Sequence, residues 1–383
     1  MLITDQDKVG LEPHYPTRLG GWSEGVSNGH SPLHQLSPYI GKMKPSMARE
    51  LISTFTKPGD TIYDPFCGSG TIALESWITG RNAISCDLNP YALCLTRGKL
   101  TPYDSHDAAL DAINEMDAAA TRVRRPDRAL QAPDWVRAFF HPETLADVLS
   151  WVAVLRRRHD DFLLSCLLGI LHHQRPGFLS YPSSHTVPYL RERLFPRLEY
   201  PELYEYRAVK ERLERKARRA LARLPDLDRD VGRSCVHANS ACYKPECKVD
   251  AIITSPPYMG QLDYGRDNRL RLWFLGVADW RRIDSSVSPT QSEFLALIER
   301  CLRLWRKVLR DGGICALVVG DASVRSYSLT LPNVITRIAT QEVGGFDLVT
   351  THTEPIPAKR RVRRGYSGSL SETVVVFSKQ SGA

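Results

Sequence analysis

Short apolar runs that end in a polar or acidic residue occur in two separate parts of the chain. The first part contains TIYDPF (61–66) and NAISCDL (82–88), with a helical pattern from Thr71 to Thr79 between them. Runs of this length, flanked by turn residues, are typical of buried strands. The second part contains five further runs: SCVHA (234–238), AIITS (251–255), ICALVVGD (314–321), FDLVTTHTE (346–354) and ETVVVFS (372–378). We therefore predict an early βαβ unit whose sheet is continued by the C-terminal part.

Between these two parts the apolar positions follow a helical period, from Ser105 to about Arg223. The expected helices open near Pro, Asp or Thr, which favour helix starts. A proline-rich connector at 175–190 interrupts them. Their segments are DAALDAINEMDAAATRV (107–123), PETLADVLSWVAVLRRR (142–158), DFLLSCLLGILHH (161–173) and YRAVKERLERKARRALARL (206–224). We predict an α/β fold in which a helical insertion at 101–233 separates an N-terminal part of the sheet, 1–100, from a C-terminal part, 234–383.

The composition is that of an ordinary globular protein, with 42% hydrophobic and 25% charged residues among 383. No apolar run approaches the roughly 20 residues needed to span a bilayer. The N-terminus, MLITDQDKVG, lacks the basic and then apolar order of a signal peptide. We therefore expect a cytoplasmic protein with no membrane partner.

The nine cysteines are scattered and form no disulfide-like framework, so we expect reduced thiols. Cys235, His237, Cys242 and Cys247 are residue types that bind zinc, but their spacing is not that of a zinc site. We predict no metal site.

Positive charge exceeds negative charge by eight, and the excess is clustered. In the helical segment 207–223 acids alternate with the bases, as on a solvated helix face. KRRVRR (359–364) is instead flanked by proline and glycine and is expected to form a loop. Basic loops suit a phosphate backbone. We expect nucleic-acid contact from Lys359, Arg360, Arg361, Arg363 and Arg364.

The segment YDPFCGSGT (63–71) joins an expected strand to an expected helix. Asp64 lies at the strand end, and Gly68 and Gly70 allow the backbone to turn tightly beside a ligand. The next expected strand ends in Asp87, where a carboxylate can accept hydrogen bonds from both hydroxyls of a ribose. Acids at the ends of two successive strands indicate a nucleoside site.

The segment TSPPYMG (254–260) follows the apolar run at 251–255. Proline donates no ladder hydrogen bond, so the strand must end there. The two prolines also fix the shape of the loop that follows. Ligands in open α/β sheets bind beyond the carboxyl ends of the strands, and we therefore expect chemistry at this loop.

Together, the two motifs resemble those of the S-adenosylmethionine-dependent DNA methyltransferases that act on exocyclic amino groups. In that family a DPFxGSGT segment binds the methionine part of the cofactor, and a Pro-Pro-aromatic loop is catalytic. The resemblance implies a Rossmann-like class I methyltransferase sheet and S-adenosylmethionine as cofactor. It assigns cofactor binding to Asp64, Phe66, Gly68, Gly70, Thr71 and Asp87, with Asp87 for the ribose, and catalysis to Ser255, Pro256, Pro257 and Tyr258.

Two further segments are similar to this family. SPYIGKMKPSMARELI (37–52) resembles the segment that closes over the cofactor, with Tyr39 and Lys42 at matching positions and Ile40-Gly41 in place of Pro-Ala. Asn239 stands where the family usually has an Asp beside the adenine ring. An Asn that caps a strand end would explain that residue as well.

The resemblance also implies a mechanism. An exocyclic amine is a poor nucleophile because its lone pair is delocalised into the base. Hydrogen bonds from the amine to Ser255 Oγ and the Pro256 carbonyl would let the nitrogen become tetrahedral, and the prolines would hold these acceptors still. Tyr258 can stack on the base, which must be flipped out of a duplex. No cysteine follows a proline as in carbon-5 methylation, so that chemistry is disfavoured.

We therefore predict a site-specific methyltransferase of double-stranded DNA. The insertion at 101–233 and the loop at 357–368 are expected to contact DNA, although a helical packing or dimerisation subdomain fits the insertion too. Ser before the prolines is typical of cytosine-N4 enzymes, and adenine N6 is the alternative. RNA guanine-N2 methylation and a non-catalytic nucleic-acid-binding subunit also stay open. So does a restriction or phage-defence partner protein.

Overall fold

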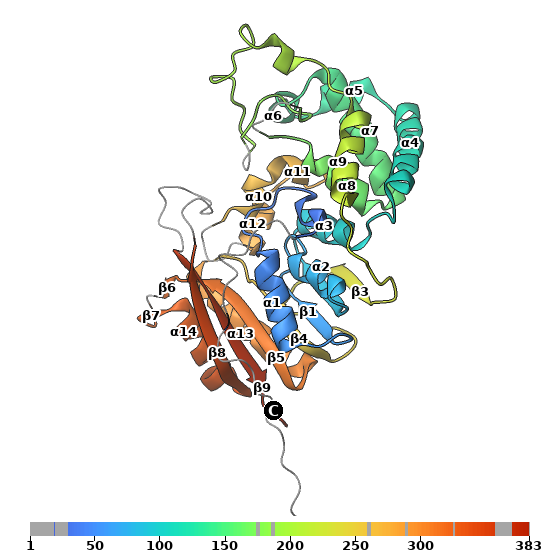
Figure 1. Cartoon of the computed structure of the whole chain (residues 1–383). Coiled ribbons are helices and arrows are strands. Elements are labelled where there is room, and N and C mark those ends of the chain that lie inside the picture. Colours follow the sequence, from blue (N-terminus) through green and yellow to red (C-terminus); the bar gives the residue numbers. More distant parts are fainter. Residues whose placement is uncertain are drawn as a thin grey trace, which may run out of the picture.

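A mixed seven-stranded sheet forms the centre of the molecule (Figure 1). The computed structural model describes residue 19 and residues 30–173, 177–184, 188–258, 262–287, 290–324, 326–356 and 370–382. The strands of this sheet are β1 (Thr61–Asp64), β2 (Asn82–Asp87), β3 (Arg233–His237), β4 (Val249–Thr254), β5 (Leu309–Gly320), β8 (Phe346–Pro355) and β9 (Ser371–Lys379). A separate ribbon pairs β6 (Ser323–Val324) with β7 (Leu329–Thr330). All seven predicted strands are confirmed.

The strand order is β3-β2-β1-β4-β5-β9-β8. The pairs from β3 to β5 are parallel, whereas β9 is antiparallel to both β5 and β8. The order reverses between β1 and β4, which is where open α/β sheets bind ligands. The predicted Rossmann-like α/β sheet is therefore confirmed.

Alternate residues of the strands face two different helix layers, as the period of two requires. Ile62 of β1 and Ile253 of β4 pack with α1 (Pro45–Phe55) on one face. Tyr63 and Ile252 face the other way and pack with α13 (Gln291–Val308) and α14 (Leu331–Arg337). Burial on both faces explains why the central strands are almost uniformly apolar. A π-helical turn, η4 (Ile338–Val343), follows α14.

The predicted large helical insertion is also confirmed. It connects α3 (Pro90–Leu100) to β3 and contains α4 (His106–Arg122), α5 (Pro126–Gln131), α6 (Asp134–Arg137), α7 (Pro142–Arg158), α8 (Asp161–Gly169), the 3-10 turn η3 (Pro201–Tyr204) and α9 (Val209–Leu221). Figure 1 shows these helices beyond the edge at which the parallel strands end. Between them and the sheet lie α10 (Tyr264–Asp267), α11 (Arg269–Phe274) and α12 (Arg281–Val287).

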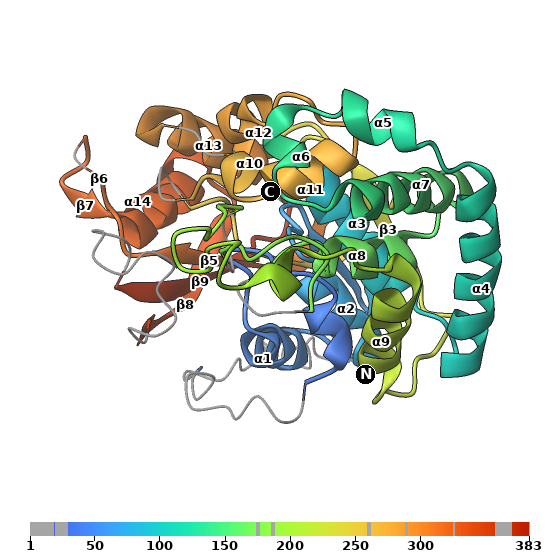
Figure 2. The same ribbon diagram turned by 90° about the horizontal axis from the view of Figure 1, so that it is seen from above.

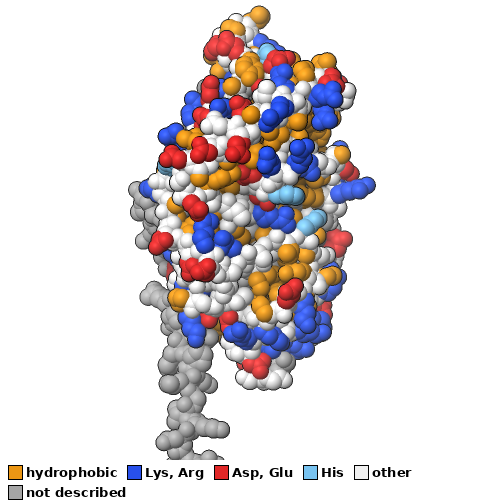
Figure 3. Space-filling view, turned by 90° about the vertical axis from the view of Figure 1, so that its right-hand side faces the viewer, with side chains coloured by type: hydrophobic (Ala, Val, Ile, Leu, Met, Phe, Trp, Pro, Cys, Tyr) orange, Lys and Arg blue, Asp and Glu red, His pale blue; other side chains and the backbone are white. Residues whose placement is uncertain are grey.

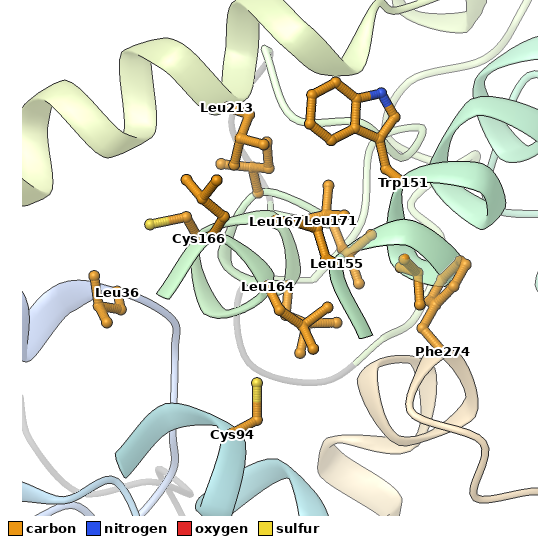
Figure 4. Packing of buried hydrophobic residues seen from close by; sticks show 14 of the residues in the cluster. Leu36, Cys94, Trp151, Leu155, Leu164, Cys166, Leu167, Leu171, Leu213 and Phe274 are labelled. Atoms are coloured by element: carbon orange, nitrogen blue, oxygen red, sulfur yellow. The ribbon is translucent and has the colours of Figure 1, made fainter. Parts of the chain in front are cut away.

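The insertion shares one hydrophobic core with the first half of the sheet. Cys94 of α3 contributes to the same cluster as Leu164 of α8 and Leu213 of α9 (Figure 4). Gly98 allows α3 and α8 to approach, because a Cβ there would lie 2.5 Å from the Asp161 carbonyl oxygen. The insertion is thus fixed to the sheet by packing and not only by its two chain connections.

Some helix predictions differ from the structure. The helix predicted over 161–173 ends at Gly169. A Cβ at this position would lie 2.1 Å from the carbonyl oxygen of Leu36, which is the C-cap residue of the turn η2 (Pro32–Gln35). Outside the insertion, the helices α3, α12, α13 and α14 were not predicted. Polar residues such as Thr96 and Lys99 of α3 are buried together with its apolar ones, so this helix shows no amphipathic period. Within the described ranges, no helix is both long and apolar enough to cross a membrane.

Candidate cofactor and catalytic site

A cavity of about 300 Å³ lies at the carboxyl edge of the sheet, where β1, β2 and β4 end. Both sequence motifs contribute to its wall. Of the predicted cofactor residues, all but Gly70 line it, and of the predicted catalytic residues Ser255 and Pro257 do. The complete lining is Tyr39, Gly41, Lys42, Met43, Asp64, Pro65, Phe66, Cys67, Gly68, Ser69, Thr71, Ile72, Asp87, Leu88, Ala238, Asn239, Ser240, Ser255, Pro257, Tyr264, Ser285, Glu293, Leu297 and Arg300.

The glycine loop is shaped by two residues with positive φ. Gly70 has φ +72° and caps the start of α2 (Thr71–Ile78), and a Cβ there would lie 2.8 Å from the Cα of Thr96 in α3. Gly68 has φ +49° and lies against the ring of Tyr39. A side chain at either position would be strained, so the chain requires glycine here. Gly70 therefore acts from behind the loop, without facing the cavity.

Asp87 connects the glycine loop to the end of β2. Its Oδ2 accepts a hydrogen bond from the backbone N–H of Gly68 at 2.9 Å, and its Oδ1 accepts one from Asn89 at 2.8 Å. Burial raises the pKa of Asp87 in spite of these donors. The carboxylate thus holds the loop in place, and it also lines the cavity, where ribose hydroxyls could donate to its remaining lone pairs.

Asp64 connects the two motifs. Its Oδ1 accepts a hydrogen bond from the Thr254 hydroxyl at 2.7 Å and one from the Phe66 backbone N–H at 3.3 Å. Burial raises the pKa of Asp64 to about 7. A cation beside a buried carboxylate lowers the pKa again and is bound favourably. S-adenosylmethionine carries an ammonium and a sulfonium group, so these residues fit the cofactor that the sequence implies.

The segment before α1 closes one side of the cavity. The centroid of the Tyr39 ring lies 5.8 Å from that of Tyr91 and 6.1 Å from that of Tyr264. Lys42 Nζ donates to the His34 carbonyl oxygen at 3.3 Å. Gly41 has φ +75°, and a Cβ there would lie 2.7 Å from Leu262 Cδ1. This contact gives a physical reason for Gly41 in the segment where relatives have Pro-Ala.

Asn239 lines the cavity and also stabilises a turn. Its side-chain oxygen accepts a hydrogen bond from the Ala241 backbone N–H at 2.9 Å. Its backbone carbonyl accepts bonds from Cys242 and Tyr243. Both interpretations of Asn239 are therefore compatible with its position, next to Ala238 and Ser240 in the wall.

The loop Ser255–Tyr258, here called the SPPY loop and predicted to be catalytic, leaves β4 and contacts β5 and β9. Ser255 Oγ donates a hydrogen bond to the Val318 carbonyl oxygen of β5 at 3.1 Å. The Tyr258 hydroxyl donates to Glu372 Oε1, at the start of β9, at 2.5 Å. The Tyr258 ring packs beside a small cluster of Ile40, Leu262 and Tyr264. Pro256 and Tyr258 do not line the cavity themselves, so this loop borders it through Ser255 and Pro257.

Four residues of the wall come from helices for which the sequence predicted no contribution to the site: Ser285 of α12, and Glu293, Leu297 and Arg300 of α13. A signal for this helix exists. Thr290 and Glu293 form a capping box, and buried positions such as Phe294 and Ile298 recur at helical spacing. Nothing in that pattern shows which residues reach the cavity, because that depends on how α13 packs on the sheet.

The predicted DNA-contacting residues Lys359, Arg360, Arg361, Arg363 and Arg364 lie outside the described residues. The inserted helices lie on the same side of the sheet as the cavity, above the ends of the parallel strands (Figures 1 and 2). On the face shown in Figure 3, Lys and Arg side chains are interspersed with acidic ones along the molecule. The position of the insertion is compatible with contact to a large substrate.

Residues 15–96 match the N6/N4 methyltransferase family, described as DNA methylase. Among curated proteins, the type II methyltransferase M.MjaII of Methanocaldococcus jannaschii is 30% identical over 99 residues, which are 26% of this chain and 18% of the relative. M.BsoBI of Geobacillus stearothermophilus is 26% identical over 282 residues, 66% of this chain and 54% of the relative. A tRNA (guanine(10)-N2)-dimethyltransferase of Methanothermobacter thermautotrophicus is 33% identical over 94 residues, 22% of this chain and 27% of the relative.

The chain spans about half the length of M.BsoBI and less of M.MjaII. Among solved structures, it is similar to TrmN from Thermus thermophilus, with a TM-score of 0.36, 14% identity and coverage of 91% of this chain and 52% of that one. The matched segment contains the glycine loop, Asp64 and Asp87, all of which meet at the cavity. Residues 15–96 are therefore similar to the DNA amino-methyltransferases, and the residues of this segment that line the cavity fit S-adenosylmethionine as the cofactor.

Proposed function

We propose that this chain transfers a methyl group to the exocyclic amine of a base flipped out of double-stranded DNA, with cytosine N4 as the favoured target and adenine N6 as the alternative. S-adenosylmethionine supplies the methyl group as an electrophilic sulfonium methyl. Asp64, Asp87, Tyr39, Lys42 and the glycine loop would hold it in the cavity.

The observation that carries this proposal is the orientation of the Ser255 hydroxyl. Its proton is donated to the Val318 carbonyl oxygen at 3.1 Å. A hydroxyl has one proton and two lone pairs, so Ser255 Oγ can offer only acceptor capacity to a group in the cavity. An amine is a suitable partner because it has protons to donate.

Acceptors at Ser255 Oγ and the Pro256 carbonyl would orient the amine and favour a tetrahedral nitrogen, whose lone pair is then available for transfer. Pro256 and Pro257 restrict the backbone that carries them. Tyr258, the aromatic residue of the loop, would contact the base. These residues position and polarise the amine, and no covalent bond to the protein is needed.

DNA contact is proposed for the helices of the 101–233 insertion and for the basic residues Lys359 to Arg364. The net charge of +8 favours a polyanion. The insertion lies on the side of the sheet that carries the cavity (Figure 1). Ser255 before the two prolines favours cytosine N4 among the amines. A restriction or phage-defence partner protein belongs to the same proposal.

Nucleoside mass spectrometry tests the proposal directly. The protein is incubated with unmethylated DNA of mixed sequence and isotopically labelled S-adenosylmethionine, and the DNA is then digested. Label in N4-methylcytosine is the expected result, and label in N6-methyladenine would change the target base. Cofactor binding without label in DNA would contradict DNA methylation.

RNA guanine-N2 methylation is the second candidate because one relative is a tRNA (guanine(10)-N2)-dimethyltransferase. A parallel reaction with unmodified tRNA distinguishes it. Label in N2-methylguanosine and none in DNA would favour this second function. A protein that binds nucleic acid without binding the cofactor would instead indicate a non-catalytic subunit.

A further inference from the structure

Glu372 is connected to the catalytic loop although it is 114 residues away from Tyr258 in the sequence. It lies at the start of β9, paired with Gly320 at the end of β5. Its Oε1 accepts the Tyr258 hydroxyl at 2.5 Å. The neighbouring strand β5 supplies the Val318 carbonyl that accepts the Ser255 hydroxyl. Two adjacent strands therefore hold the two hydroxyl groups of the SPPY loop.

The direction of each hydrogen bond follows from the chemistry of its acceptor. A carbonyl or a carboxylate oxygen can only accept, so Ser255 and Tyr258 must both be donors toward the sheet. Burial, and next the charge and hydrogen bond of Glu372, raise the pKa of Tyr258 well above its usual range. The phenol therefore keeps its proton and remains the donor. Ser255 Oγ has only lone pairs left for other partners.

We propose that Glu372 is a positioning residue for methyl transfer, which holds the Tyr258 side chain in place within the catalytic loop. This proposal rests on the proposed function, since it concerns how the same loop receives an amine. Glu372 acts through Tyr258 and does not touch the substrate.

One physical effect follows from this contact. The hydrogen bond anchors the phenol oxygen and so restricts rotation of the Tyr258 side chain about its Cα–Cβ bond. Less conformational freedom is therefore lost when a base packs against the ring. The preference for an amine comes from Ser255, whose proton is taken by the Val318 carbonyl and whose lone pairs would be left unpaired opposite a carbonyl oxygen.

The effect should appear in the transfer step and not in cofactor binding, because Glu372 is not among the residues that line the cavity. Glu372→Ala and Tyr258→Phe should each lower kcat by about tenfold, the size expected for a lost hydrogen bond to a charged group. The double variant should be no slower than the slower single variant, since each change removes the same interaction. Affinity for S-adenosylmethionine should stay within about twofold in all three variants.

Two variants separate positioning from a structural role. Glu372→Gln keeps an acceptor oxygen for the phenol and should recover most of the lost kcat. Asp347→Ala removes an exposed carboxylate of β8, which accepts a hydrogen bond from Gln380 and lies away from the loop, and should leave kcat unchanged. Additive effects in the double variant, or an equal loss of kcat in Glu372→Gln and Glu372→Ala, would overturn the proposal.

A measurement without turnover keeps this inference separate from the proposed function. In protein labelled with ¹³Cζ-tyrosine, the Tyr258 resonance is assigned by its absence in Tyr258→Phe. It should shift in Glu372→Ala and return toward its original position in Glu372→Gln. An unchanged resonance in Glu372→Ala would refute the contact even if DNA methylation is confirmed. A shifted resonance in a protein that methylates no nucleic acid would refute the proposed function and leave only the contact.

Discussion

The Thr254 hydroxyl donates a hydrogen bond to Asp64 Oδ1 over 2.7 Å, and this bond joins the end of the catalytic strand to the end of the cofactor strand. The two residues are 190 positions apart in the chain. They meet because β1 and β4 are parallel neighbours, so that their carboxyl ends coincide. The cofactor loop and the SPPY loop are thereby held in a fixed relation, which methyl transfer between two bound groups requires.

Ser255→Ala should lower the rate of methyl transfer by about 100-fold or more, the size expected for loss of a preorganised polar contact to the reacting group. Affinity for S-adenosylmethionine should be nearly unchanged, since the proposed hydrogen bond of Ser255 is to the target amine. Single-turnover transfer and calorimetric titration of the cofactor measure the two quantities separately. An equal loss in both would show that Ser255 supports the cofactor and not the amine.

Cofactor affinity should rise with pH between about 5.5 and 7. Burial raises the pKa of Asp64 to about 7 in the free protein, so this group is largely protonated at pH 5.5. A bound ammonium group favours the ionised form, so binding releases a proton and becomes stronger as pH increases, by up to about tenfold per pH unit. Titration calorimetry at several pH values measures this slope.

Asp64→Asn is the matched variant for that experiment, since it keeps the shape of the side chain and removes the titration. It should bind the cofactor about 10- to 100-fold more weakly at pH 7.5, with a nearly flat profile below pH 7. A wild-type slope that persists in Asp64→Asn would assign the pH dependence to another group.

Gly70→Ala should destabilise the protein by about 2–5 kcal/mol, because a Cβ at φ +72° would lie 2.8 Å from the Cα of Thr96. The added Cβ can be accommodated only if the backbone of the glycine loop or of α3 moves. Gly59→Ala is the control: its φ is +88°, but no atom lies within 4 Å of the added Cβ. It should cost only the backbone strain, about 1–2 kcal/mol. Urea unfolding measures the free energy of unfolding of both variants. Equal losses of stability would show that the contact with α3 does not contribute.

Charge reversal at Lys359, Arg360, Arg361, Arg363 and Arg364 should weaken DNA binding and reduce its salt dependence, since fewer counterions are released. Binding is measured by fluorescence anisotropy over a series of salt concentrations. Lys57→Glu is the control, because this exposed residue precedes β1 at the opposite edge of the sheet. Its salt slope should equal that of the wild type. An unchanged slope after reversal of the basic segment would exclude that segment from DNA contact.

Most of the strands and many of the helices could be predicted from the local sequence. The seven strands were recognised as short, mainly apolar runs, most of which are followed by Gly, Pro, Asp or Asn, and the two chemical motifs stand directly after β1 and β4. Helix α3 was missed because polar Thr96 and Lys99 are buried along with its apolar residues, which removes the period on which recognition depends.

The sequence by itself determined the residue types at the two strand ends, and therefore the family, the cofactor and the chemistry to expect. Glycine and proline act locally through their backbone preferences, and a strand end needs no distant partner to be recognised. Only the tertiary structure decided what faces these motifs. It brings Asp64 to Thr254, Tyr258 to Glu372 and α13 to the cavity wall, and it packs the inserted helices onto α3 at Gly98. Each of these relations depends on strand order and helix packing between segments far apart in the chain, which no local pattern encodes.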